Sequence, residues 1–324
     1  MPPTFFITRR IPQPGIERLS QAGRVLINPH DRPLTPEELV LLGRDAAGWV
    51  TMLTDRVSAE ILAPCSRLRG IANYAVGFDN IDLAACTRGR VGVSNTPDVL
   101  TDATAEIAWA LLLACARRVV EADAFLRSGR WRGWQPLEFL GTLVTGKTLG
   151  ILGAGHIGRR VARIAQGFNM RILYTARHAK ALWEKDLGAR GVSLDELLCE
   201  SDFISLHVPL TEETRQIIGA AELRRMKPTA VLINTARGPL LDETALVAAL
   251  REKRLGAAGL DVYEREPQIA AGLAQLDNVV LLPHLGSATR ETRTRMALLA
   301  AENLIAMVRG RRPPNPLNPE LWPE

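Results

Sequence analysis

A glycine-rich turn between a strand and a helix is the feature that most constrains the fold. The apolar run Thr148–Leu152 predicts a strand, Gly153–Gly158 (GAGHIG) follows it directly, and Arg159–Gln166 is predicted as a helix. In a GxGxxG turn the first glycine permits the tight turn, the second lets a pyrophosphate approach the backbone, and the third lets the helix pack on the sheet. The N–H groups of the helix N-terminus would face the phosphates. This context predicts a dinucleotide site; a plain glycine turn is the alternative.

Short apolar runs alternate with helical segments on both sides of this turn, which predicts parallel sheets with helices on both faces. The strands expected in the first third are Phe5–Thr8, Val25–Asn28, Trp49–Leu53, Leu68–Asn73 and Val91–Asn95. After the strand before the glycine turn, further strands are expected at Arg171–Tyr174, Phe203–Val208, Ala230–Thr235, Ala257–Val262 and Val279–Leu282. The two alternating regions indicate an α/β protein with two doubly wound parallel-sheet domains.

Several helices and irregular segments are also predicted. Thr35–Gly43, with Thr35 as N-cap and Pro36 at the first position, and Asn80–Arg88 are expected helices of the first region. Thr101–Arg118 is a long helix with apolar residues nearly all round, so it should be buried. The remaining segments are Ser128–Gly141, expected to be irregular and able to pack on a partner subunit; Ala288–Val308, expected to be the last helix; and Arg311–Glu324, expected to be an extended proline-rich tail.

Composition bounds the class of protein. Hydrophobic residues make up 47% of the 324, which suits two domains with substantial cores. Lys+Arg exceed Asp+Glu by 40 − 35 = 5, a mild excess that suits small anionic ligands and does not by itself indicate nucleic acid. The four cysteines have no metal-site spacing, and we expect free thiols in a reducing compartment and no metal. With no apolar run of about 20 residues and no signal-peptide pattern, we expect a cytoplasmic protein without a membrane segment.

The end of the second strand of the glycine-turn region bears on the choice of cofactor. An NAD site usually has an acid here that holds the ribose 2′-OH, but Ala176 stands in its place and Arg177 follows, with His178 close by. A carboxylate would repel a 2′-phosphate, whereas a guanidinium can bind one through two hydrogen bonds. We therefore predict NADPH over NADH. The alternative is that Arg177 is a solvated surface residue and that both cofactors work.

Four polar residues follow successive strands of the same region, where ligands of open α/β sheets bind. Arg237 follows Ala230–Thr235, Asp261 closes the next strand with Glu266 five residues on, and His284 follows the last strand. This set fits hydride transfer to a 2-oxo acid. Arg237 can pair with the substrate carboxylate and polarise the ketone, His284 can donate a proton to the alkoxide, and Glu266 can orient the imidazole.

Each of these residues also has a structural interpretation. Arg237 could pair only with a carboxylate of the protein, Asp261 could support the loop or the cofactor, and Glu266 could lie on the surface. His207, at another strand end, is interpreted as structural or cofactor-lining. The prediction of function depends on the co-location of the candidates rather than on any one of them.

The motifs together resemble those of the D-isomer-specific 2-hydroxyacid dehydrogenases, and the resemblance covers nearly the whole chain. It is closest to the glyoxylate/hydroxypyruvate reductase branch, notably in the first two motifs. The motifs are Asn73–Asp82, Asn95–Glu106, Gly153–Gly158, Asn234–Gly238, Gly259–Tyr263 with Glu266-Pro267, and Pro283–Ser287.

The resemblance implies a role for each matching residue. Arg237, Glu266 and His284 would form the catalytic triad. The backbone amides of Val76 and Gly77 would hold the substrate carboxylate, with Leu53 bordering the pocket and Arg237 and His284 also contacting substrate. The residues assigned to cofactor binding are Thr104, Gly153, Ala154, Gly155, His156, Ile157, Gly158, Ala176, Arg177, His178, Val208, Pro209, Thr214, Thr235, Ala236, Arg237, Asp261, His284 and Gly286.

The resemblance also implies the domain organisation: a flavodoxin-like substrate domain of residues 1–99 and 288–324 around an inserted Rossmann cofactor domain of residues 100–287, usually in a homodimer. The implied reaction is the NADPH-dependent reduction of glyoxylate to glycolate and of hydroxypyruvate to D-glycerate, with a small anionic 2-oxo acid as substrate. The alternatives are another 2-oxo acid, a non-catalytic NAD(P)H sensor, and a phosphite dehydrogenase. The last is disfavoured because Val76 stands where that enzyme carries a lysine.

Overall fold

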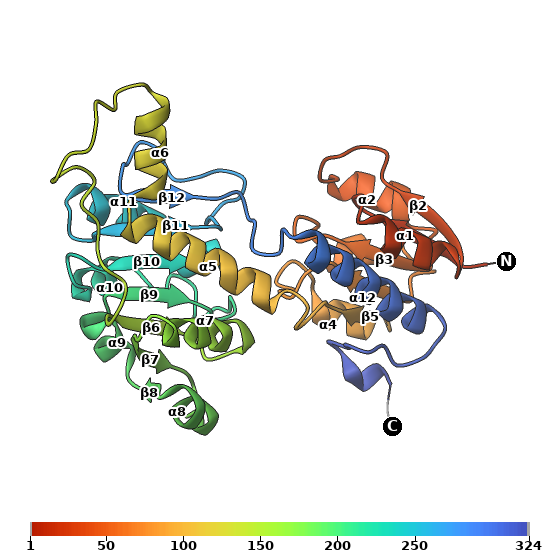
Figure 1. The fold of residues 1–324 in the computed structure, drawn as a ribbon. Helices are drawn as coiled ribbons and strands as arrows, with labels where there is room; N and C mark the ends of the chain where they lie inside the picture. Colours follow the sequence, from red (N-terminus) through yellow and green to blue (C-terminus); the bar gives the residue numbers. More distant parts are fainter. Residues whose placement is uncertain (1, 323–324) are drawn as a thin grey trace. The chain divides into compact units, whose positions relative to one another are not determined.

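The computed structural model describes residues 2–322, which divide into two compact units: residues 2–100 with 287–322, and residues 101–286. Each unit contains one all-parallel sheet with helices on both faces (Figure 1). The α/β class with two doubly wound parallel sheets, predicted from the alternation of strands and helices, is thereby confirmed. Among the described residues, no helix combines the length and the apolar character needed to span a membrane.

The first unit has a five-stranded sheet in the order β2-β1-β3-β4-β5. This is the flavodoxin-like order, in which the direction of winding reverses between β1 and β3. The strands are β1 (Thr4–Ile7), β2 (Arg24–Ile27), β3 (Gly48–Thr51), β4 (Gly70–Asn73) and β5 (Gly92–Ser94). The helices are α1 (Gln13–Ser20), α2 (Pro36–Gly43), α3 (Ala59–Leu62), α4 (Leu83–Arg88) and α12 (Arg290–Val308).

Alternate residues of the strands of this sheet bury their side chains on opposite faces. Phe5 and Ile7 of β1 pack with α1 and α12, whereas Phe6 packs with α2, α3 and α4. A buried parallel sheet needs this two-sided cover, because its strands have no face that tolerates water. Trp49 of β3, fully buried, donates its indole N–H to Gly43 O at 3.0 Å and so fixes the end of α2 on the sheet.

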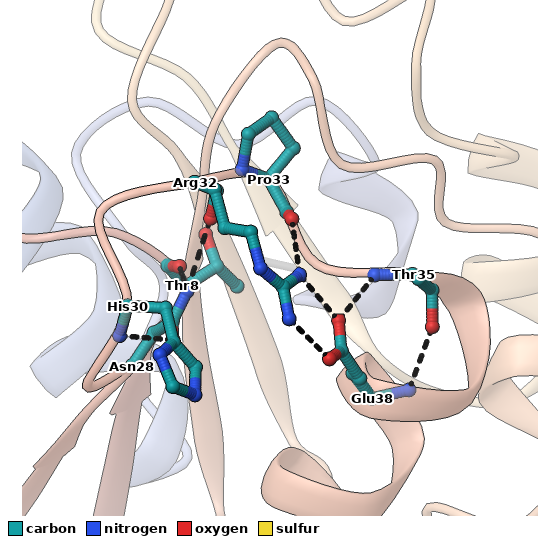
Figure 2. Close-up of polar contacts among 7 residues, drawn as sticks. All are labelled: Thr8, Asn28, His30, Arg32, Pro33, Thr35 and Glu38. Atoms are coloured by element: carbon teal, nitrogen blue, oxygen red, sulfur yellow. Dashed lines mark hydrogen bonds and ion pairs between the residues drawn. The ribbon is translucent and has the colours of Figure 1, made fainter.

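The N-terminus of α2 forms as its sequence predicts. Thr35 Oγ1 accepts from Glu38 N at 3.3 Å and Glu38 Oε2 accepts from Thr35 N at 2.9 Å, which is a capping box (Figure 2). Arg32 pairs with the same carboxylate, and its hydrogen bond is the main cause that lowers the pKa of Glu38 to about 2. In the same view, Asn28 Nδ2 donates to Thr8 O at 2.9 Å, which ties the ends of β1 and β2 together.

The second unit has a seven-stranded sheet in the order β12-β11-β10-β9-β6-β7-β8, which is a Rossmann order with one further strand. The strands are β6 (Thr148–Leu152), β7 (Arg171–Thr175), β8 (Arg190–Gly191), β9 (Phe203–Leu206), β10 (Val231–Asn234), β11 (Ala257–Leu260) and β12 (Val279–Leu281). The helices are α5 (Thr101–Ala116), α6 (Val119–Arg127), α7 (His156–Gln166), α8 (Ala181–Leu187), α9 (Leu194–Glu200), α10 (Ala220–Arg225) and α11 (Glu243–Arg251). Short 3₁₀ turns, Gly238–Leu240 and Pro319–Leu321, complete the described elements of the chain.

Two apolar layers enclose this sheet. One lies under α5 and α7 and includes Leu111, Leu112 and Ile151; the other lies under α9, α10 and α11 and includes Leu206 and Leu232. Most of α5 is buried, but Asp102, Glu106 and Ala110 are exposed, so the predicted burial all round the helix is only partly correct. Its apolar composition reflects how closely it lies on β10, β11 and β12.

Some predicted bounds were wrong, mostly by one to four residues. β3 ends at Thr51 rather than Leu53, because Met52 starts a turn closed by Asp55 N at 3.0 Å. α4 begins at Leu83 rather than Asn80, because Asp82 Oδ1 caps it by accepting from Ala85 N at 2.8 Å. α7 begins at His156, directly after Gly155.

Other differences concern whole elements. α1, α3, α6 and the two-residue β8 were not predicted, since elements of two to nine residues contain too few turns or alternations to give a strong periodic signal. α12 begins at Arg290 with Thr289 as its cap, not at Ala288, and α5 ends at Ala116, before the predicted basic end. The tail predicted as extended contains the 3₁₀ turn Pro319–Leu321, and its last two residues lie outside the described residues.

Candidate active site

The glycine turn lies where the strand order of the seven-stranded sheet reverses, between β6 and β9. Gly153 has φ +107°, and a Cβ there would lie 2.5 Å from His207 C, so only glycine fits. At Gly158 a Cβ would lie 2.4 Å from Gly153 O, which explains the third glycine. Gly155 is the N-cap residue of α7, and a Cβ there would meet nothing within 4 Å. The backbone in front of α7 is therefore open, as a pyrophosphate requires.

The end of β7 carries basic groups and no acid at the expected position. Ala176, Arg177 and His178 are all exposed. The pKa of Glu213 is lowered chiefly by its hydrogen bond with Thr211, with a smaller contribution from the positive charge of Arg177. Arg177 follows β7, the neighbour of β6 in the sheet, so it lies at the same edge as the glycine turn. Its side chain is exposed there and can bind an anion.

The loop after β9 is held close to the glycine turn. His207 N donates to Leu152 O at 2.7 Å, and the His207 ring pairs with Ser205 Oγ at 2.8 Å. Burial lowers the pKa of His207 to about 4, so its imidazole is neutral at pH 7. Further along, Thr214 Oγ1 donates to Pro209 O at 2.7 Å and closes the loop that follows Val208. His207 is therefore suited to a structural or lining role rather than to proton donation.

The loop after β10 is shaped by the side chain of Asn234. Its Oδ1 accepts from Ala236 N at 3.0 Å and its Nδ2 donates to Arg237 O at 2.8 Å. Thr235 Oγ1 is buried and has no hydrogen-bond partner among residues 2–322, so a bound group can satisfy it. Arg237 is half-buried, and one of its donors meets Ala236 O at 2.8 Å.

Asp261, after β11, shapes the loop that follows β12. Its two carboxylate oxygens accept from Leu285 N at 2.6 Å and from Gly286 N at 2.7 Å. Thr104 Oγ1 of α5 donates to Gly286 O at 3.1 Å. Burial is the main cause that raises the pKa of Asp261. Of the two interpretations of Asp261, support of the loop is the one that these contacts display.

His284 and Glu266 form a hydrogen-bonded pair. His284 Nδ1 lies 3.0 Å from Glu266 Oε2, and Glu266 Oε1 accepts from Tyr263 N at 3.1 Å. Burial alone would raise the pKa of Glu266, but the hydrogen bond and charge of His284, together with the Tyr263 N–H and the charge of Arg237, lower it. Both side chains keep about a third of their surface exposed, 33% for His284 and 37% for Glu266. Because Nδ1 is occupied, Nε2 is the ring nitrogen left for a substrate.

Three predicted substrate contacts lie in the first unit. Leu53 is half-buried in the turn after β3, and Val76 and Gly77 lie in the loop after β4. Asn95 Nδ2 donates to Val76 O at 2.7 Å, and Asn73 Nδ2 donates to Gly77 O at 2.8 Å. With both carbonyls held, the N–H groups of Val76 and Gly77 have no hydrogen-bond partner within residues 2–322. Adjacent free N–H groups of this kind can bind a carboxylate.

The sequence-based reasoning missed the residues that hold the predicted ones in place. Asn73, Asn95 and Asn234 lie within the quoted motifs, but their roles were not inferred, and Tyr263 was not singled out. A polar amide at the end of a buried strand is a usable signal, because it must find hydrogen-bond partners in the adjoining loop. Among the described residues, no group of three or more His, Cys, Asp or Glu side chains could hold a metal ion, and all four cysteines are free.

Comparison with known proteins agrees with this arrangement. The family model described as D-isomer specific 2-hydroxyacid dehydrogenase, NAD binding domain, matches residues 109–286. A glyoxylate reductase of Thermococcus kodakarensis is 52% identical, with 99% of this chain and 98% of that protein aligned.

Solved structures give the same result. A glyoxylate reductase from Paecilomyes thermophila superposes with a TM-score of 0.88 at 34% identity, covering 98% of this chain and 99% of that one. An NADPH-dependent glyoxylate/hydroxypyruvate reductase from Sinorhizobium meliloti, in complex with NADP and malonate, gives 0.87 at 32% identity, covering 98% and 97%. The chain belongs to the D-isomer specific 2-hydroxyacid dehydrogenase family and is an NAD(P)-dependent oxidoreductase that acts on 2-hydroxy acids.

Proposed function

We propose that the protein uses NADPH to reduce glyoxylate to glycolate and hydroxypyruvate to D-glycerate. The observation that carries the proposal is the His284–Glu266 pair, 3.0 Å apart, on the sheet edge that also holds Arg237 and the glycine turn. A proton donor with an acid behind it is what reduction of a ketone or aldehyde requires. The names of relatives such as the Thermococcus kodakarensis and Sinorhizobium meliloti proteins support these two substrates.

In this proposal the substrate is held by its carboxylate. The guanidinium of Arg237 pairs with the carboxylate and polarises the carbonyl group, because its donors suit planar oxyanions. The free N–H groups of Val76 and Gly77 are also assigned to the carboxylate, and Leu53 is assigned to the border of the pocket. These contacts orient the 2-oxo carbon and leave its oxygen for a proton donor.

His284 is assigned as the proton donor. Its Nε2–H gives a proton to the carbonyl oxygen as that oxygen gains charge, and the ring recovers a proton from solvent after the 2-hydroxy acid leaves. Glu266 stabilises the imidazolium and holds the ring by its Nδ1. The nicotinamide supplies the hydride that adds to the carbonyl carbon.

The residues around the glycine turn fit a dinucleotide. The backbone from Gly153 to Gly158 and the N-terminus of α7 are assigned to the pyrophosphate, and the unpartnered hydroxyl of Thr235 can bind the nicotinamide end. Ala236, Asp261, His284 and Gly286 are assigned to the same end. Arg177 and His178, exposed after β7, are assigned to the 2′-phosphate of NADPH. NADH is kept as an alternative cofactor. The absence of an acid at the end of β7 allows a 2′-phosphate to bind there but does not make that phosphate necessary.

The proposal is tested by following NADPH consumption with glyoxylate, hydroxypyruvate and bulkier 2-oxo acids. We expect the highest kcat/KM with the first two acids and a lower value with NADH. Turnover of only a bulkier acid would assign the enzyme to another substrate of the same chemistry. No turnover of any acid would contradict the proposed function.

We also propose that the protein is a homodimer, as predicted from its relatives, and we keep the cytoplasm as its expected location. The support is an apolar segment of the second unit, α6 and residues 128–143, which exposes Trp134 to 82% and Leu137 to 80%. A cavity of about 660 Å³ lined by Leu140 and by the amino ends of β11 and β12 adjoins it. We expect sedimentation at the mass of a dimer, and dissociation of that dimer by Leu137→Glu; a monomeric wild-type protein would contradict this.

A further inference from the structure

The turn that contains Leu53 is fixed by a buried carboxylate. Asp55 N donates to Met52 O at 3.0 Å, and Asp55 Oδ2 accepts from Met52 N at 2.7 Å and from the hydroxyl of Thr8. Asp55 is 1% exposed, and Thr8 follows β1 while Met52 follows β3. The turn is therefore anchored where the strand order of the five-stranded sheet reverses, at the carboxyl ends of its strands.

Asn80 holds the same turn from the other side. Its Nδ2 donates to Met52 O at 3.1 Å and to Asp55 O at 2.9 Å, the two carbonyls that flank the turn. Its main-chain oxygen accepts from Val57 N at 2.9 Å, just beyond the turn. The same side chain thus gives Asp55 O a partner in a partly buried place, and it gives Met52 O, which already accepts from Asp55 N, a second one.

A second amide connects Asn80 to the loop of Val76 and Gly77. Asn73 Nδ2 lies 3.3 Å from Asn80 Oδ1 and donates to Gly77 O at 2.8 Å. Asn73 is itself fully buried and accepts from Thr51 Oγ1 at 3.1 Å. The two loops assigned to the substrate are therefore joined through Asn80 and Asn73, with no charged side chain in the connection.

We propose that Asn80 is a positioning residue for substrate binding, whose amide sets the separation of the Leu53 turn and the Val76–Gly77 loop. This inference rests on the proposed function, which gives both loops to the 2-oxo acid. Asn80 needs no contact with the substrate for this role. Loss of its amide leaves the turn anchored through Asp55 but removes the bonds that join the turn to Asn80, so its spacing from the Val76–Gly77 loop is no longer fixed.

The experiment compares the wild-type enzyme with Asn80→Ala in steady-state reduction of glyoxylate. We expect the KM for glyoxylate to rise about tenfold, because two hydrogen bonds that fix the loop are lost, with kcat changed by less than about twofold. The Kd for NADPH, measured by fluorescence titration, should not change. A role in folding alone would lower the active fraction, and hence kcat, without raising KM.

Asn318→Ala is the matched control. Asn318 is fully buried in the same unit, accepts from Val93 N at 2.8 Å and donates to Val91 O at 2.9 Å, so its removal costs comparable hydrogen bonds at the other ends of the strands. We expect a lower melting temperature with an unchanged KM. If Asn80→Ala does not fold, Asn80→Ser, which keeps one donor, should raise KM by a smaller factor.

The outcomes separate the two proposals. A wild-type enzyme that does not reduce glyoxylate overturns the proposed function, and this inference with it. A wild-type enzyme that does so, with Asn80→Ala or Asn80→Ser matching its KM or with Asn318→Ala raising KM equally, overturns the positioning role alone.

Discussion

The carboxyl edges of the two sheets carry different kinds of side chain. At the edge of the seven-stranded sheet the loops present charged or titratable groups, Arg237, Glu266 and His284, which stay partly exposed. At the edge of the five-stranded sheet the loops are held by the buried carboxyl group of Asp55 and by neutral amides such as Asn73 and Asn80, which donate to backbone carbonyls. The first arrangement suits proton transfer and anion binding, and the second suits a shape that must not change. The same open-sheet topology can therefore supply chemistry from one unit and positioning from the other.

Replacing the proposed proton donor should give the largest effect. For His284→Ala we expect kcat to fall by about 10²–10⁴-fold, the usual contribution of general acid catalysis, with little change in the Kd for substrate. His30→Ala, at an exposed histidine after β2, is the control and should leave the rate unchanged. An active His284→Ala enzyme would place the proton donor elsewhere and would remove the chemical difference between the two edges.

The positive charge of Arg177, after β7, should determine whether the enzyme prefers NADPH or NADH. Removing a charge-assisted hydrogen bond costs about 1.5–3 kcal/mol, so Arg177→Ala should raise the KM for NADPH by about ten- to a hundredfold and leave that for NADH nearly unchanged. Arg163→Ala removes an equal charge from the last turn of α7 and serves as the control. Equal effects of Arg177→Ala on both cofactors would mean that the guanidinium does not read the 2′-phosphate.

Replacing Glu266, the acid that pairs with the imidazole of His284, should lower kcat less than replacing His284 itself. Glu266→Gln keeps a hydrogen-bond acceptor but no longer stabilises the imidazolium, and we expect kcat to fall about tenfold. An equal kcat in the wild-type and Glu266→Gln proteins would show that the contact between Glu266 and His284 is structural only. This variant acts on kcat, whereas Asn80→Ala on the other edge is expected to act on KM, and the pair of results tests the division of roles directly.

The same variant gives the smallest expected effect, on the pH dependence of stability. Because the pKa of Glu266 is lowered in the folded protein, its ionised form contributes stability at pH values above the ordinary Glu pKa of about 4.3, and this contribution is lost as the pH falls through the lowered value. Thermal melts should show the wild-type protein more stable than Glu266→Gln near pH 7. The difference should shrink below about pH 4. A constant difference across this range would contradict the assignment.

The sequence predicted the alternation of strands and helices, and it predicted which polar side chains follow the strands of the second unit. The strand–helix alternation and the glycine turn follow from local periodicity and from the residues that a tight turn accepts. Thr35 caps α2 as predicted, by accepting from Glu38 N. Arg237 and His284 were predicted to share one edge because each closely follows an apolar run, and parallel strands bring such positions together.

Only the tertiary structure decided which contacts hold the loops and at which residues the helices begin. α4 starts at Leu83 because Asp82, and not an earlier residue, caps it. The side chain of Asn80 therefore lies outside the helix and donates to the turn after β3. The contact of Asp261 with the backbone after His284, and that of Asn80 with Met52, join positions that lie more than 20 residues apart in the chain. Such contacts depend on how whole layers of helices and strands pack, so the sequence did not predict them. Periodicity and turn chemistry act over a few neighbouring residues, and for that reason the sequence predicted the strands, the helices and the glycine turn.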